Sequence, residues 1–241
     1  MTLVLVPSVG FGGPPGGAET QQVGIKFELA GDKLKQFLER KDLKLRVWDG
    51  TKYSIEVNTV VNIYAVDDKK NENAINSIKE ALVDWEKKYT EYGKEGEMGE
   101  TDGDLGEEMA ELIMTGIDIP ESGDYVCETS IVREDGQKQR VAVGIFKKNR
   151  GVFPGGRLGE AKLPGSALLS YNLANPESQL DRQYRAPGET YGRAGSVNRQ
   201  AMIKELARDP NIERVHAHAI NSRAAESLEK DGFVQIGGDC Q

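Results

Sequence analysis

The sequence contains few residues that could form a covalent framework or a metal centre. Only two cysteines, Cys127 and Cys240, occur among 241 residues, too few for a disulfide framework or a cysteine-rich zinc site. The two histidines, His216 and His218, stand two residues apart and therefore project from the same face of a strand. Because there is no third histidine to complete a zinc site, we expect no bound metal.

Basic residues and long apolar runs are also scarce. The chain has 31 Lys and Arg against 39 Asp and Glu, a formal net charge of −8, so it lacks the positive surplus that nucleic-acid binding requires. No apolar run approaches the roughly 18–20 residues of a membrane span. The run Leu3–Val9 is interrupted by Pro7 and has no basic flank of the signal-peptide kind. We expect a soluble, cytoplasmic protein that binds neither nucleic acid nor membrane.

Glycine and proline are concentrated near the N-terminus, where all but one of residues 10–17 are one of the two. A glycine-rich loop can bind phosphate, but here two consecutive prolines interrupt the helix it would need, and no Gly-Lys-Ser/Thr follows. We therefore interpret residues 1–20 as a flexible arm. The arm is part of an N-terminal extension, 1–50, that precedes the main domain, 51–241.

Hydrophobic periodicity and turn signals predict an α+β fold. The predicted helices cover residues 32–40, 72–92, 107–115 and 196–207. The predicted strands cover residues 43–48, 54–66, 125–133, 139–147, 166–173, 212–220 and 234–236. Residues 93–108, 149–164 and 174–196 are expected to be loops, the first of them acidic and solvated.

The last strand-helix-strand segment carries the most specific pattern in the chain. Its matching positions are Asn221, Ala224, Glu229-Lys230, Gly232 and Phe233. The segment resembles the end of the GNAT N-acetyltransferase superfamily, which closes with a strand, Asn-x-x-Ala/Ser, a short helix ending in Glu-Lys-x-Gly-Phe, and a last strand. The resemblance implies a mixed, mostly antiparallel sheet flanked by helices. It also implies that strands 166–173 and 212–220 run parallel and splay apart, with helix 196–207 crossing between them.

The same resemblance implies that acetyl-coenzyme A is the co-substrate. The start of a helix presents unpaired backbone N–H groups and a positive dipole, which suits a pyrophosphate. The segment expected to form this solvent-facing cradle is Gly192, Arg193, Ala194, Gly195, Ser196, Val197 and Asn198. Arg193 and Arg199 would add charge there, with Arg185 in reserve, and Asn221 would lie near the pantetheine arm. The family signature Gln/Arg-x-x-Gly-x-Gly/Ala is not matched in this loop.

The implied reaction is direct transfer of an acetyl group to an amine. Many members of the family protonate the departing thiolate with a tyrosine, but that position here is Leu228. His218 or His216 could take the proton from the amine, directly or through water. A structural histidine, packed or hydrogen-bonded at the sheet, is the commoner explanation of such residues, and Tyr171 and Glu128 are further candidates for the acceptor site. The acidic balance favours a cationic acceptor, either a protein lysine or N-terminus or a small amine. The alternatives are a GNAT-like binding module without turnover and a secreted effector or toxin.

Overall fold

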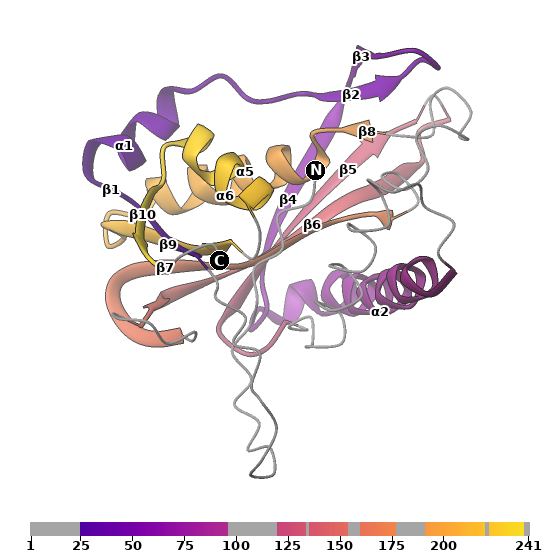
Figure 1. Ribbon diagram of the computed structural model, residues 1–241. Helices are drawn as coiled ribbons and strands as arrows, with labels where there is room; N and C mark the ends of the chain where they lie inside the picture. The colour runs from indigo at the N-terminus through magenta and orange to yellow at the C-terminus, as the bar shows by residue number, and fades with distance from the viewer. Residues whose placement is uncertain are drawn as a thin grey trace, which may run out of the picture.

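The computed structural model describes residues 25–95, 120–133, 135–153, 160–176, 191–219 and 222–238. It is an α+β fold built on a mostly antiparallel mixed sheet with helices on both faces (Figure 1). At this level the predicted fold class is confirmed. Among the described helices, none has the length and apolar composition needed to cross a membrane.

The main sheet has seven strands. From one edge to the other they are Val234–Gly237 (β10), Ile25–Ala30 (β1), Arg214–Ala219 (β9), Glu160–Ala174 (β7), Lys138–Val152 (β6), Asp124–Val132 (β5) and Thr59–Ala65 (β4). Only β7 and β9 are parallel; the other neighbours are antiparallel.

A smaller sheet joins β2 (Leu45–Trp48) to β3 (Tyr53–Val57) and β8 (Tyr191–Gly192). The single strand expected over 54–66 is thus two strands in different sheets, separated at Asn58. The backbone leaves one sheet and enters the other at that residue, where the hydrophobic alternation of the sequence is already interrupted.

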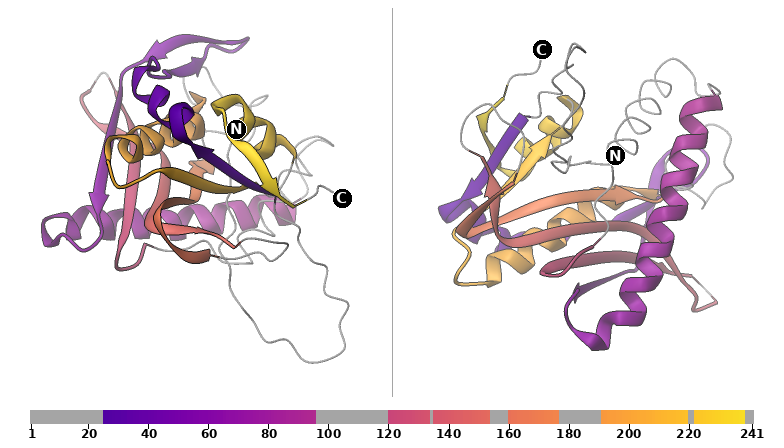
Figure 2. Two further views of the ribbon diagram at one scale, coloured as in Figure 1. Left: turned by 90° about the vertical axis from the view of Figure 1, so that its left-hand side faces the viewer. Right: turned by 90° about the horizontal axis from the view of Figure 1, so that it is seen from below.

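The helices divide between the two faces of the main sheet (Figure 2). One face carries α1 (Gly31–Gln36), α5 (Ala194–Arg208) and α6 (Ser222–Asp231), and the other carries α2 (Glu72–Glu95). Short 3-10 turns follow α1 at Phe37–Glu39 and precede α2 at Lys69–Asn71. The apolar stripe expected on α2 is buried in the core: Ile75, Ile78, Leu82 and Trp85. The predicted helix 107–115 lies outside the described residues.

Strand β1 is the second strand from one edge of the main sheet, although no strand was expected there. It lies between β9 and β10 and buries Ile25, Phe27 and Leu29. Part of the predicted N-terminal extension is therefore integrated into the sheet, whereas the predicted arm lies outside the described residues.

The hairpin of β6 and β7 extends further than predicted. The expected loop over 149–164 contains the end of β6 and the start of β7, which pair from Arg150–Lys162 to Val152–Glu160. Register shifts in this ladder and a left-handed Asn149, with φ 57°, bend the hairpin. The bend brings Val152 and Gly151 against His216 on β9.

Candidate functional site

The residues proposed for amine chemistry share one face of the main sheet. The strand register places Glu128 on β5, Tyr171 on β7, and His216 and His218 on β9 with their side chains on the face that also carries α2. The start of α5 packs on the opposite face, where Asn198 contacts β5. The sheet therefore separates the two halves of the predicted site.

The segment predicted to bind the cofactor, 192–198, consists of the end of a strand followed directly by the start of a helix. Gly192 belongs to β8 and pairs with Arg46 of β2, and a Cβ at Gly192 would lie 3.0 Å from the Tyr53 ring. Arg193 then adopts the left-handed conformation, with φ 71°, and α5 begins at Ala194. The side chain of Arg193 is exposed and that of Ser196 is half-buried.

The expectation that this whole segment faces solvent is wrong. Ala194 and Val197 are buried in an apolar cluster with Leu45 and Tyr191, and Asn198 is fully buried. A helix that lies over the sheet must direct every third or fourth side chain into it. Within the segment, this leaves the side chains of Arg193 and Ser196 facing outward.

Asn198 is held by a neutral network. Its Nδ2 donates to the Cys127 carbonyl at 2.8 Å and to Thr129 Oγ1 at 3.1 Å, and its Oδ1 accepts from Asn172 Nδ2 at 2.6 Å. Burial raises the pKa of the Cys127 thiol, which keeps it protonated and unreactive. Asn198 thus fixes α5 on the sheet.

Arg199 was expected to add positive charge near the pyrophosphate, but in the structure its side chain is paired with another residue of the protein. Its side chain is 2 % exposed and forms an ion pair with Asp231 at the end of α6. A second interaction joins the guanidinium to Ser227 Oγ at 2.8 Å. Arg199 therefore ties α5 to α6.

The parallel strands β7 and β9 lie side by side, as predicted, with α5 following β7 in sequence. Their pairing runs from Ser166–Arg214 to Leu169–Ala217. β7 continues to Ala174 and β9 to Ala219, so the two strands extend beyond their shared ladder. The fully buried Asn172 lies on this continuation of β7, and its Oδ1 has no hydrogen-bond partner among the described residues.

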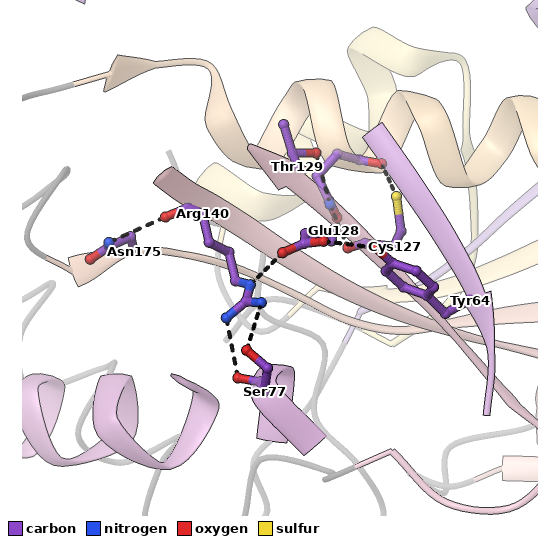
Figure 3. A network of polar contacts seen from close by, with 8 residues as sticks. Tyr64, Ser77, Cys127, Glu128, Thr129, Arg140 and Asn175 are labelled. Atoms are coloured by element: carbon purple, nitrogen blue, oxygen red, sulfur yellow. Dashed lines mark hydrogen bonds and ion pairs between the residues drawn. The ribbon is translucent and has the colours of Figure 1, made fainter. Parts of the chain in front are cut away.

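Glu128 is the centre of a charged network under α2 (Figure 3). Its carboxylate accepts from Arg140 Nε at 2.7 Å and from the Tyr64 hydroxyl at 3.1 Å. Burial, and after it the Glu128 charge, raise the pKa of Tyr64. The remaining guanidinium nitrogens of Arg140 donate to the carbonyl and hydroxyl oxygens of Ser77 on α2, at 3.2 and 3.3 Å.

Both ring nitrogens of His216 are engaged. Nδ1 accepts from the Val152 N–H at 3.0 Å, so the neutral ring carries its proton on Nε2, which lies 3.2 Å from Glu28 Oε2. Burial lowers the pKa of His216, and the carboxylate of Glu28 opposes that shift. These contacts fit a structural histidine packed at the sheet better than a histidine that acts as a base.

The other candidates that the structure describes are buried. His218 is 3 % exposed and lies opposite Lys26 in the β1–β9 ladder, and Tyr171 is 2 % exposed. Leu228, at the position of the family's tyrosine, is fully buried. Asn221 and Arg185 lie outside the described residues.

Sequence reasoning missed Lys26 and Glu28, which come from β1 and reach the same face as the histidines. Lys26 is buried and donates to the Phe153 carbonyl at 2.8 Å; burial lowers its pKa. The alternation of Ile25, Phe27 and Leu29 with these charged residues was the signal for a strand. Within the described residues, no group of three or more His, Cys, Asp or Glu side chains is arranged to hold a metal ion.

Comparison of the chain with protein-family models, with curated proteins and with solved structures found no match in any of the three.

Proposed function

We propose that this protein is an N-acetyltransferase that transfers an acetyl group from acetyl-coenzyme A to an amine. The observation that carries the proposal is the pair of parallel strands β7 and β9, which continue past the end of their shared ladder. A strand that separates from its neighbour can pair with an extended ligand through backbone N–H and C=O groups. The amide-containing pantetheine arm is such a ligand.

The start of α5 fits the pyrophosphate end of the same molecule. No side chain caps this helix, and its first turn contains no acidic residue. Its first backbone N–H groups and dipole therefore favour an anion, and the exposed Arg193 guanidinium stands beside them.

Transfer requires a neutral amine that attacks the thioester carbonyl, after which the C–S bond breaks and the thiolate leaves. The proton released by the amine needs an acceptor on the protein or in solvent. His218 or His216 is the acceptor that we propose, and both are buried at the sheet. A small cationic amine or a protein lysine remains the proposed acceptor.

Arg193→Gln tests the coenzyme site. If the guanidinium contacts phosphate, the variant should bind acetyl-coenzyme A about tenfold more weakly in calorimetry, as loss of a charge-assisted hydrogen bond implies. Arg208→Gln, at the other end of α5 and 66 % exposed, is the matched control and should bind like the wild type. Equal affinities in all three proteins would place the coenzyme elsewhere.

A GNAT-like binding module without turnover is the second candidate. The buried Leu228 and the engaged nitrogens of His216 favour it. Measuring acetyl transfer to a panel of amines separates the two, because a module binds acetyl-coenzyme A but releases no free thiol. Absence of binding at millimolar acetyl-coenzyme A would contradict both.

A further inference from the structure

A pocket of about 310 Å³ opens between α2 and the hairpin of β5 and β6. Its lining residues are Ala81, Trp85, Arg133, Gln137, Lys138, Gln139, Arg140 and Asn175. Trp85 and Asn175 are buried, whereas Arg133, Gln137 and Lys138 are exposed. The pocket therefore has an aromatic and amide floor and a cationic rim.

The lining of this pocket is positively charged, whereas the chain as a whole is negatively charged. The sequence carries a net charge of −8, yet three cations and no carboxylate line the pocket among the described residues. Two acids of β5 and of the β5–β6 turn have partners in the structure. Glu128 is paired with Arg140, and Asp135 Oδ1 accepts the Gln137 backbone N–H.

Two of the three cations have no carboxylate partner among the described residues. Arg133 donates from Nε and from a terminal nitrogen to the same oxygen, Gln139 Oε1, at 3.1 and 2.7 Å, and it pairs with no carboxylate in the described part of the chain. Lys138 has no hydrogen bond or ion pair within those residues. The rim thus carries two positive charges with room for a ligand.

The side-chain amide of Gln139 adds hydrogen-bond donors whose orientation is fixed. Gln139 Oε1 also accepts from the Tyr191 hydroxyl at 3.2 Å, so three donors hold this oxygen. The orientation of the side chain is thereby determined, and its Nε2 hydrogens remain available to a ligand. Cations and amide N–H groups together complement oxyanions.

We propose that this pocket binds a compact organic dianion, either a phosphate monoester or a dicarboxylate. Two cations without a carboxylate partner among the described residues match two negative charges, and the volume is near the lower limit of small-molecule pockets. The pocket is lined by α2, whereas the proposed coenzyme site lies at the start of α5. An anionic ligand is therefore proposed for one part of a protein whose overall negative charge favours cations.

Titration of the full chain with glycerol 1-phosphate, with succinate and with glycerol, in calorimetry at low salt, tests this inference. We expect both anions to bind, glycerol to give no heat, and added salt to weaken the interaction because the rim charges are exposed. Tighter binding of glycerol 1-phosphate identifies a phosphate monoester site, and tighter binding of succinate identifies a dicarboxylate site.

Lys138→Gln and Arg133→Gln should each weaken binding about tenfold, as loss of a charge-assisted contact does. Lys162→Gln, an exposed position at the far end of the β6–β7 ladder, is the matched control and should leave the affinity unchanged. Failure of both anions to bind, or equal affinity in the wild type and Lys138→Gln, would overturn the inference. The titrations contain no acetyl-coenzyme A, so this failure is distinct from failure of the transferase proposal.

Discussion

Beneath α5 the sheet buries neutral amides, whereas beneath α2 it buries charged groups. The Asn198 network satisfies uncharged donors and acceptors at full burial. The Glu128–Arg140 pair keeps 12 and 21 % of its side chains exposed and lies beside the cationic pocket. A charge is costly to remove from water and an amide much less so. The neutral network can therefore define packing, and the charged one remains near solvent, where a ligand can reach it.

Asn198→Ala should produce the largest effect. It removes hydrogen-bond partners from Asn172, Thr129 and the Cys127 carbonyl in a fully buried site, so we expect a loss of about 3 kcal/mol in the free energy of unfolding. Urea denaturation measures this loss. Ser196→Ala, on the same helix but half-buried, should change stability by less than about 0.5 kcal/mol. Equal effects in the two variants would show that the Asn198 network does not define the packing of α5.

Glu128→Gln should have an intermediate effect. The ion pair with Arg140 is partly buried, so its loss should cost about 1–2 kcal/mol, between the values for exposed and buried pairs. A double-mutant cycle with Arg140→Gln isolates the interaction. Glu56→Gln, which breaks an exposed pair with Lys44, should cost less than about 0.5 kcal/mol. A coupling energy near zero in the cycle would contradict the proposed difference between the two faces.

The smallest effect is the pH dependence due to His216. Burial lowers its pKa, so near pH 6.5 the unfolded chain binds a proton that the folded protein does not. Stability therefore falls as the pH decreases through this value towards the folded pKa, by at most about 1.4 kcal/mol per pH unit. Glu28 limits the effect, whereas Arg214 adds to it.

His216→Gln should flatten the dependence of the unfolding free energy on pH between 7.5 and 5.5. Denaturant titrations at several pH values provide the measurement. An unchanged slope would mean that His216 does not contribute to the acid sensitivity of the fold.

Local signals in the sequence predicted the elements that depend on local contacts. The apolar stripe of α2 is buried. Asp49-Gly50, a typical turn sequence, joins β2 to β3, with Asp49 Oδ1 accepting from two following N–H groups. The parallel neighbours β7 and β9 followed from the resemblance of the C-terminal segment. β1 was missed although Ile25, Phe27 and Leu29 alternate with polar residues as in a strand. Its sheet neighbours come from the other end of the chain, and local sequence does not show that pairing.

The candidate site was predictable only in part for the same reason. Parity placed His216 and His218 on one face, as found. The partners of these residues depend on register: Glu28 reaches His216 through the β1–β9 ladder, and Arg140 reaches Glu128 through the β5–β6 hairpin. Burial of Asn198 depends on how α5 rotates over the sheet, which the small residues before it do not determine.

The position of β1 between β9 and β10 also constrains the order of folding. During synthesis, residues 25–30 leave the ribosome long before residues 214–219 and 234–237 exist, so β1 must wait unpaired until these two later strands have been made. Contacts this distant in sequence slow folding and leave strand edges exposed in the meantime. The completion of the sheet is therefore a late step in which the first described strand joins the last two.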